Sequence, residues 1–515
     1  MNDPVPVIKD VDQLYAQDDL PSQRERFTNL VNSFQVNFDT SPAFVARSPG
    51  RVNIIGEHID YSLYEVLPMA IAADVLIGVS LVPLRTHQEA RVSLRNVNST
   101  KFKHASFKVP DYGNIDIDAS ELQWYNYFKS GFRGAVELLQ KRIPGFSPCG
   151  MNVLVDGNVP AGGGLSSSAA FVCASALAVL RANGQDQVIK KDLVELAIVS
   201  ERSVGVNSGG MDQAASVFTI RGDAVSVTFS PELNAEAIKF PQLDPPITFM
   251  IAQSFVAADK HVTAPKHYNL RVVECTLAAE VLAAKLDVSL KDDAGPLGRS
   301  LRGFQSAYFQ MIGSEGHDDK SKLEELLSLT KTRLDPQGYT RDEIGSILSI
   351  SKDELEKRFM TKFRVETERF LLQQRARHVF EEALRVLAFK KLLQSPPEDG
   401  SLLSRLGDLM NQTQVSCREV YECSCPELDQ LCDIAREAGS YGSRLTGAGW
   451  GGCTVHLVPK NKVEAIEAAW EEKYYKKRDS SMTKQKMAEA AAVVVSEPGH
   501  GSMVYVRRTS SRLTG

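Results

Sequence analysis

The segment that most constrains the fold lies between residues 151 and 184. MNVLVDGNVP, residues 151–160, alternates apolar and polar side chains, which predicts a β-strand. The glycine and serine run AGGGLSSS follows, and the apolar stretch AAFVCASALAVLRAN then predicts a helix that ends with Gly184 as its C′ residue. In such a strand, turn and helix, backbone N–H groups and the helix dipole converge on an anion. We therefore expect a phosphate site at this loop.

The chemistry of the loop agrees with that expectation. Glycines let the backbone approach oxygen atoms, while serine hydroxyls can cap a helix, donate to phosphate or bind Mg²⁺. The Lys-Ser/Thr ending of the common P-loop is absent. A tight turn with a serine N-cap is an equally good interpretation of this loop taken alone.

Length and charge limit the class of protein. The chain has 515 residues, which favours two or three domains, and its 43% hydrophobic and 24% charged residues are typical of globular proteins. A net charge of −5 provides no basic field for nucleic acid or a membrane surface. The acidic N-terminus does not resemble a signal peptide, and no apolar run is long enough to span a bilayer. We expect a cytoplasmic protein, with the nucleus as a further compartment.

The 8 cysteines are scattered, which favours reduced, buried thiols over disulfides. Four of them cluster near the C-terminal end: Cys417, Cys423, Cys425 and Cys432. Their spacing does not match a zinc knuckle, and no histidine lies among them. A zinc site is therefore not favoured.

Changes in sequence pattern predict the domain organisation. Short alternating runs from 43 to 110 predict strands, and PQLDPPITFMIAQS near Pro241 predicts a linker followed by a strand. Residues 265–400 read as helical, with a capping box at Ser351 and Glu354 and one long helix over 368–394. We divide the chain into an N-terminal extension, a first domain, a second domain with a helical insertion at about 285–400, and a tail: 1–40, 41–240, 241–500 and 501–515.

A charged cluster lies in SPGRVNIIGEHIDYSLYEVLPMAI, residues 48–71. Four charged or titratable residues lie within ten positions beside the apolar VNII: Arg51, Glu57, His58 and Asp60. Charges next to a strand need partners or a ligand, and a polyhydroxylated ligand would suit these groups. An internal ion-pair network is the simpler interpretation of this segment alone.

Two further glycine motifs accompany this cluster. In SERSVGVNSGGMDQAAS, residues 200–216, Glu201 ends a helical stretch and Asp212 follows a double glycine, where a helix cap is the ordinary alternative. SYGSRLTGAGWGGCTVHLV, residues 440–458, predicts a glycine turn that leads into a strand. SRLTG recurs at 511–515 without the glycines, and we treat this as coincidence.

Together these motifs resemble those of the galactokinase branch of the GHMP small-molecule kinases. GRVNIIGEHIDY, VPAGGGLSSSAAF, VNSGGMDQAAS and SRLTGAGWGGC occur in the order and approximate spacing of that family, from about residue 40 to about residue 500. YNLRVVE, RARHVF and YECSCPE are similar to the longer fungal members. The resemblance implies a two-domain α/β fold of mixed α+β type, with the active site in the cleft between the halves.

The resemblance also implies an ATP site with Mg²⁺. The loop glycines would cradle the triphosphate: Gly162, Gly163 and Gly164. The hydroxyls would come from the following serines: Ser166, Ser167 and Ser168. Ser168 and Glu201 would bind the metal. Trp124 would contact adenine, with a core tryptophan as the alternative, and Lys260 would either reach the nucleotide or remain solvated.

By the same resemblance the other substrate is galactose, phosphorylated at its anomeric hydroxyl to give galactose 1-phosphate. Asp212 would be the catalytic base and Arg51 its partner, keeping the carboxylate ionised and offsetting negative charge in the transition state. The remaining sugar contacts would come from one set of residues: Glu57, His58, Asp60, Asn207, the Gly209 backbone and Tyr268.

Two alternatives accompany the resemblance. Some fungal members bind sugar and ATP and then engage a transcriptional repressor, and those without catalysis have a shortened serine–alanine stretch. Because GGGLSSSAA is complete here, we expect an enzyme, with repressor binding as an open second role. The related N-acetylgalactosamine kinases share GRVNIIGEHIDY and SRLTGAGWGGC, and the space around the C2 substituent would decide between the two sugars.

Overall fold

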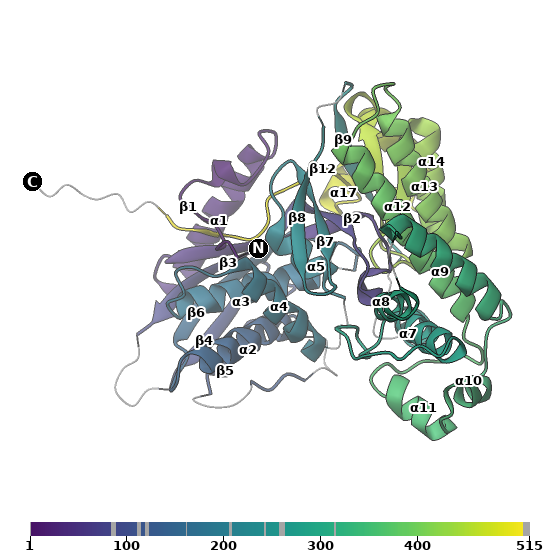
Figure 1. Ribbon diagram of the computed structural model, residues 1–515. Helices are drawn as coiled ribbons and strands as arrows, with labels where there is room; N and C mark the ends of the chain where they lie inside the picture. Colours follow the sequence, from purple (N-terminus) through teal and green to yellow (C-terminus); the bar gives the residue numbers. More distant parts are fainter. Residues whose placement is uncertain are drawn as a thin grey trace, which may run out of the picture.

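Two lobes make up the computed structural model of the chain, and each contains its own β-sheet (Figure 1). The structure describes residues 2–83, 89–110, 115–118, 123–160, 162–204, 209–241, 244–256, 263–313 and 316–507. Asn207 and Lys260, both expected at the site, lie outside the described residues.

The first lobe is built on a seven-stranded sheet with the order β1-β13-β2-β3-β6-β4-β5. Its strands are β1 (Val7–Ile8), β2 (Phe44–Ile55), β3 (Leu67–Val82), β4 (Arg91–Asn96), β5 (Ala105–Lys108), β6 (Gly150–Gly157) and β13 (Met503–Tyr505). The pairs β1–β13 and β4–β6 are parallel, and the other neighbours are antiparallel.

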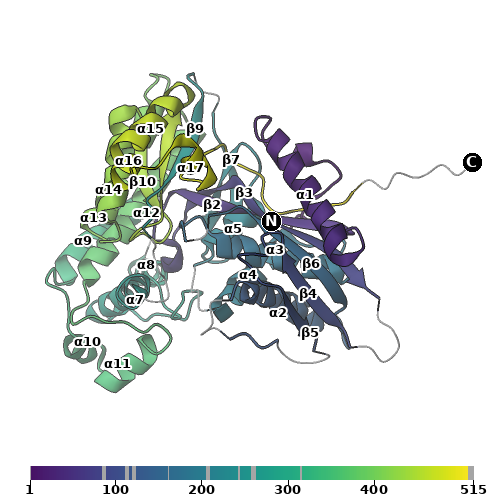
Figure 2. The same cartoon turned by 180° about the vertical axis from the view of Figure 1, so that it is seen from behind.

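Helices cover both faces of this sheet (Figures 1 and 2). Helix α1 (Leu20–Phe38) packs on the face that carries Val45, Leu76 and Leu154. The next residue along each strand points to the opposite face, where the largest apolar core lies. Three helices pack there: α2 (Tyr125–Arg142), α3 (Ser167–Ala182) and α4 (Lys190–Glu201).

The predicted strand, loop and helix unit is confirmed. Strand β6 leads through the glycines into α3, and Gly184 follows the helix with φ +82°. Most of α3 consists of buried alanine, valine and leucine, so the sheet and α2 approach it closely. The helix N-terminus is thereby fixed rigidly at the end of the loop.

The second lobe contains a four-stranded antiparallel sheet with the order β10-β11-β9-β12. Its strands are β9 (Ile247–Gln253), β10 (Gly442–Thr446), β11 (Cys453–Pro459) and β12 (Val493–Ser496). Between the lobes lie α5 (Met211–Phe218) and the hairpin of β7 (Asp223–Thr228) and β8 (Asn234–Lys239) (Figure 1).

Most of the second lobe is helical, as the sequence pattern predicted. The α-helices before β10 include α7 (Tyr268–Lys285), α8 (Leu301–Ile312), α9 (Asp319–Arg333), α10 (Arg341–Leu348), α11 (Lys352–Phe359), α12 (Leu372–Gln394), α13 (Leu402–Glu419) and α14 (Pro426–Ala438). After β11 come α15 (Val463–Trp470), α16 (Lys476–Arg478) and α17 (Lys484–Glu489). Helix α12 confirms the long helix expected near 368–394. Ser351 caps α11, but the reciprocal capping box belongs to the preceding helix, at Thr340 and Glu343.

Described segments near both ends of the sequence join the first lobe. Residues 1–40 and 501–515 were expected to lie outside the two domains, yet β1 and α1 pack on the sheet and β13 pairs with both β1 and β2. Strands of two or three residues are too short to show an alternating pattern, so the sequence could not reveal them.

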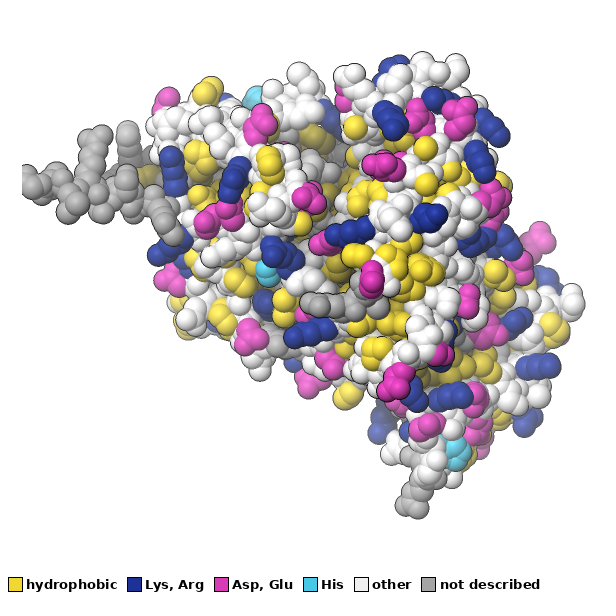
Figure 3. All heavy atoms as spheres, turned by 90° about the horizontal axis from the view of Figure 1, so that it is seen from above, with side chains coloured by type: hydrophobic (Ala, Val, Ile, Leu, Met, Phe, Trp, Pro, Cys, Tyr) yellow, Lys and Arg dark blue, Asp and Glu magenta, His cyan; other side chains and the backbone are white. Residues whose placement is uncertain are grey.

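The surface and the thiols agree with an ordinary globular chain. Acidic and basic side chains are interspersed on the face that Figure 3 shows. The eight cysteines are free thiols. Across the described residues, no helix combines the length and apolarity needed to cross a membrane.

Candidate active site

The glycine loop ends at the N-terminus of α3. Gly162 and Gly164 have φ values of +73° and +72°, and Ser166, the N-cap residue, has φ +57°. The Ser166 hydroxyl does not cap the helix, and its oxygen is buried without a hydrogen-bond partner. A left-handed serine at a helix start is uncommon, and here it turns the backbone toward α3. An anion can bind at such an N-terminus.

A second glycine loop, residues 447–452 between β10 and β11, packs directly on the first. A Cβ on Gly447 would lie 2.5 Å from the Gly164 carbonyl oxygen, and a Cβ on Gly164 would lie 2.9 Å from the Thr446 oxygen. Both glycines have positive φ, so no other residue fits here without strain. The loop expected to hold phosphate therefore lies where the two lobes meet.

Arg51 joins this loop to Asp212. Its Nε donates to Asp212 Oδ1 at 2.8 Å, its Nη2 lies 2.6 Å from the same oxygen, and its Nη1 donates to the Gly164 carbonyl at 2.6 Å. Asp212 is the second residue of α5, whose N-cap is Gly210, so it is not the helix cap. A buried guanidinium at this distance favours the ionised form of the carboxyl group.

Asp60 lies near Asp212 at the start of a short 3₁₀ turn, Asp60–Ser62. Its side chain is buried, and burial followed by the charge of Asp212 raises the pKa of Asp60 from 3.8 to about 6. A Cβ on Gly209 would clash with the Asp60 carboxylate and lie 2.6 Å from the Tyr61 nitrogen. The backbone of Gly209 thus packs against Asp60 and Tyr61 of the GEHIDY motif.

Glu57 connects the charged segment to the second glycine loop. Its Oε2 accepts hydrogen bonds from Arg444 Nη2 and from the Gly447 N–H at 3.1 Å. Arg444 also donates to the Asn53 carbonyl at 2.8 Å, and both charged side chains are buried. This carboxylate oxygen is therefore occupied by the protein itself.

Both ring nitrogens of His58 are bonded within the protein. Nε2 lies 2.9 Å from the Ala448 carbonyl and must donate to it, so in the neutral ring Nδ1 accepts from the Tyr61 hydroxyl at 2.9 Å. Burial opposes a charge here, but the Cys423 thiol and Glu57 outweigh it and raise the pKa of His58. Through these two ring hydrogen bonds, His58 ties its turn to Tyr61 and Ala448.

Tyr268, the first residue of α7, completes this side of the site. Its ring centroid lies 5.7 Å from those of His58 and Tyr61. Burial and the nearby charges of Asp60 and Asp212 raise the pKa of Tyr268 well above its ordinary value. The structure thus brings together seven of the expected residues: Arg51, Glu57, His58, Asp60, Gly209, Asp212 and Tyr268.

The residues expected at Mg²⁺ have suitable chemistry. Glu201, the last residue of α4, is fully buried, and its Oε2 accepts from the Gln213 amide. Ser168 lies in the first turn of α3. A hydroxyl and a carboxylate fit Mg²⁺, which often takes only one or two protein ligands and completes its shell with phosphate and water. In the described part of the chain, no group of three or more His, Cys, Asp or Glu residues could hold a metal by itself.

Trp124 packs beside the glycine loop's helix. Its ring stacks on Phe171 of α3 with centroids 6.1 Å apart, and its Nε1 donates to the Lys103 carbonyl at 2.9 Å. These are contacts of a half-buried core residue, and adenine contact stays a prediction.

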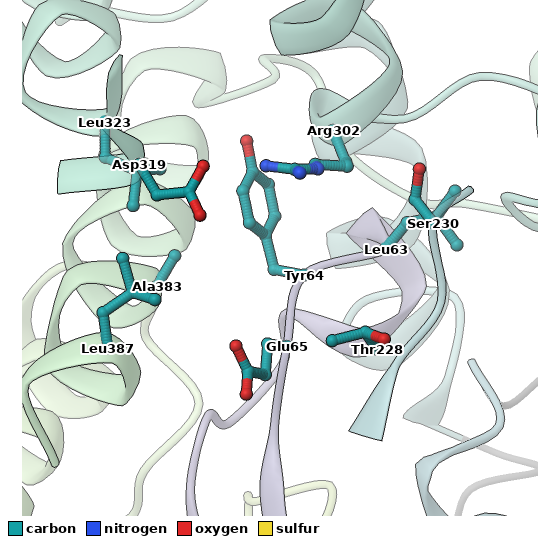
Figure 4. Close-up of a pocket in the computed structure, with 10 residues that line it drawn as sticks. All are labelled: Leu63, Tyr64, Glu65, Thr228, Ser230, Arg302, Asp319, Leu323, Ala383 and Leu387. Carbon is teal, nitrogen blue, oxygen red and sulfur yellow. The ribbon is translucent and has the colours of Figure 1, made fainter. Parts of the chain in front are cut away.

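A separate cavity of about 130 Å³ lies between the lobes (Figure 4). Its walls come from the end of the 3₁₀ turn, the β7–β8 hairpin, α8, α9 and α12, and include Tyr64, Arg302 and Asp319. None of the expected site residues lines it. This cavity is therefore distinct from the candidate site.

Sequence reasoning missed a layer of residues behind the site. Three segments that lie more than 40 residues apart in the sequence meet in one network of ion pairs and hydrogen bonds: YNLRVVE, RARHVF and YECSCPE. Arg375 binds Glu274 at 2.8 Å and Glu422 at 2.6 Å, while Arg271 Nε donates to the Tyr421 carbonyl at 2.8 Å. Apart from the likeness of these segments to fungal members, no local pattern indicated their contact.

Three family models match the chain. The galactokinase galactose-binding signature matches residues 32–81, the GHMP kinases N terminal domain matches 126–219, and the GHMP kinases C terminal model matches 389–476. The first match contains the GEHIDY turn, and the second contains the glycine loop and Asp212.

Known proteins resemble the chain over nearly its whole length. A galactokinase of Saccharomyces cerevisiae is 41% identical over 507 residues, covering 93% of this chain and 95% of its own. One of Schizosaccharomyces pombe is 40% identical, with the same coverage. The crystal structure of Lactococcus lactis galactokinase complexed with galactose aligns with a TM-score of 0.64 and 24% identity, covering 93% of this chain and 99% of that chain. The expected two-domain α/β fold is confirmed.

Proposed function

Because the chain belongs to the galactokinase family of GHMP kinases, we propose that it transfers the γ-phosphoryl group of ATP to the anomeric hydroxyl of galactose. The products are galactose 1-phosphate and ADP. The observation that carries this proposal is the position of Arg51, whose guanidinium binds both Asp212 and the Gly164 carbonyl. One rigid side chain therefore sets the distance between the base and the phosphate loop, and phosphoryl transfer depends on such positioning.

Asp212 is the proposed base. Its carboxylate accepts the proton of the attacking hydroxyl, and Arg51 keeps it ionised beforehand. The same guanidinium offsets negative charge that develops on the transferred group. Arg51 thus supports both the proton transfer and the phosphoryl transfer.

The glycine loop holds ATP in this proposal. Backbone N–H groups of residues 162–164 and the N-terminus of α3 face the phosphates, and Ser166 and Ser167 supply hydroxyls. Mg²⁺, held by Ser168 and Glu201, would neutralise phosphate charge when bound. Trp124 and Lys260 are the proposed contacts to the rest of the nucleotide.

Galactose lies on the opposite side of Asp212. Asp60 and Tyr268 offer a carboxylate and a hydroxyl to the sugar, while Glu57 and His58 shape the turn that carries Asp60. Asn207 and the backbone of Gly209 complete the sugar contacts. Buried polar groups of this kind reject sugars that lack a matching hydroxyl.

The test is steady-state ADP release from purified protein with galactose and, separately, with N-acetylgalactosamine. We expect galactose to have the larger kcat/KM. Equal or better use of the acetylated sugar would assign the chain to that substrate instead. No turnover with either sugar, together with ATP-dependent and galactose-dependent binding to a transcriptional repressor, would make the chain a sensor in the cytoplasm or nucleus.

A further inference from the structure

We propose that Glu382 of α12, together with His378 one helical turn before it, positions the sugar-binding turn Gly56–His58 by holding its main chain. This role rests on the proposed function of that turn. Helix α12 belongs to the second lobe and lies more than 300 residues away in the sequence, so the contact joins the two lobes at the sugar site.

The turn has a conformation that needs support. Gly56 has φ +105° and His58 has φ +60°. A histidine in the left-handed region is strained and persists only where surrounding bonds hold it. A Cβ on Gly56 would also lie 3.0 Å from the Val66 backbone, so the glycine cannot be exchanged to relieve this strain.

Glu382 holds the N–H groups of this turn. Its Oε1 accepts from the Gly56 nitrogen at 2.8 Å and from the Glu57 nitrogen at 3.1 Å. Its Oε2 accepts from Arg385 Nε at 2.7 Å and from the Thr413 hydroxyl at 2.8 Å. Despite complete burial, Arg385 and Arg444 lower the pKa of Glu382 to about 2, so its bonds are charge-assisted.

His378 holds the carbonyl group of the same turn. Its Nε2 lies 3.0 Å from the Glu57 carbonyl and donates to it, so Nδ1 accepts from the Ser416 hydroxyl at 2.9 Å. Burial lowers the pKa of His378 to about 3, so the ring is neutral and its tautomer is fixed. The main-chain N–H and C=O of Glu57 are therefore both bound by α12.

A structural ion pair elsewhere on α12 provides a matched control. Lys390 lies two turns further along, where its Nζ binds Glu65 at 2.8 Å and Glu236 at 3.0 Å. It also joins α12 to the first lobe, but it does not bond to residues 56–58. A variant of Lys390 thus weakens the contact between the lobes without changing the turn.

The experiment compares four variants of the full chain with the wild type: Glu382→Gln, His378→Asn, His378→Gln and Lys390→Met. Glutamine places an N–H group near the position of the histidine Nε2, whereas asparagine does not reach it. We expect Glu382→Gln and His378→Asn to raise KM for galactose about tenfold and to leave KM for ATP within about twofold, the scale of one hydrogen bond. His378→Gln and Lys390→Met should keep the wild-type KM for galactose.

Hydrogen exchange supplies a readout that is independent of catalysis. Backbone amides of residues 53–62 should exchange faster in Glu382→Gln and His378→Asn than in Lys390→Met. If Glu382→Gln does not fold, the two His378 variants still decide. Unchanged exchange and an unchanged galactose KM in Glu382→Gln and His378→Asn would overturn the positioning role. Effects of the same size in Lys390→Met would also overturn it. Absence of galactose turnover in the wild type would instead overturn the proposed function, and hydrogen exchange would then test the positioning alone.

Discussion

In the proposed function, the glycine loop and the sugar-binding turn Gly56–His58 bind ligands of opposite kinds, one charged and one neutral. The loop at 162–166 presents backbone in left-handed conformations and a Ser166 hydroxyl without a protein partner. The turn at 56–58 is buried, and its N–H, C=O and side-chain groups bind the second lobe. A triphosphate brings strong charge of its own, so open donors suffice to bind it. A neutral sugar offers only hydroxyls, and the protein must fix its partners beforehand.

The largest effect should come from Asp212, which belongs to neither region and faces both. Asp212→Ala should lower kcat by about 10²–10⁴, the usual contribution of a general base, while galactose and ATP binding stay nearly unchanged. Steady-state kinetics measures kcat, and calorimetric titration measures the binding of galactose and ATP. A near-normal kcat in this variant would show that the base is elsewhere.

The next prediction tests whether Asp60, which follows the sugar-binding turn, lowers the stability of the chain in return for sugar binding. Burial raises the pKa of Asp60 from 3.8 to about 6, so the folded chain loses stability as pH rises through that range. The rise corresponds to about 3 kcal/mol, and Asp60→Asn should recover up to this amount above pH 7 and nothing near pH 4. Urea unfolding of the wild type and of Asp60→Asn, near pH 4 and above pH 7, measures this difference in unfolding free energy.

The same variant should bind galactose more weakly, because in the proposed function an ionised Asp60 accepts hydrogen bonds from sugar hydroxyls. In the wild type, kcat/KM for galactose should fall as pH decreases through about 6, since the raised pKa of Asp60 then leaves the carboxyl group protonated. The charge of Asp212 contributes to this raised pKa. A lower unfolding free energy for Asp60→Asn than for the wild type at pH 8 would contradict the expectation that Asp60 lowers stability.

A smaller effect concerns the contact between the two glycine loops. Gly447→Ala places a Cβ 2.5 Å from the Gly164 oxygen at φ +87° and should cost about 1–3 kcal/mol in unfolding free energy and raise KM for ATP. Gly184→Ala is the matched control, because its φ is +82° and nothing lies within 4 Å of the added Cβ. An equal loss of unfolding free energy in Gly447→Ala and Gly184→Ala would mean that backbone strain alone, and not the contact between the loops, explains the effect.

The smallest effect should come from Ser166. Because its buried hydroxyl has no protein partner, Ser166→Ala should change unfolding free energy by less than about 0.5 kcal/mol and raise KM for ATP about threefold. Ser175→Ala on the same helix removes a hydroxyl that donates to the Phe171 carbonyl at 2.6 Å, and should affect stability without affecting ATP. An unchanged KM for ATP in Ser166→Ala would place the nucleotide away from this hydroxyl.

The glycine loop and the turn Gly56–His58 also differ in how far the sequence could predict them. The strand, loop and α3 form one continuous segment, so alternation and glycine chemistry were enough to predict them. The pairing of Arg51 with Asp212 spans 161 residues and came only from the resemblance to a family. Glu382, His378 and Arg444 were missed because each bonds to the turn from more than 300 residues away, and no local pattern encodes such contacts.

The most direct test of the account is a crystal structure of the chain with galactose and a non-hydrolysable ATP analogue. We predict that the γ-phosphate lies against the backbone of residues 162–168 and that the anomeric hydroxyl lies within hydrogen-bond distance of the Asp212 carboxylate. A nucleotide bound away from this loop, or a sugar whose anomeric hydroxyl faces away from Asp212, would contradict it.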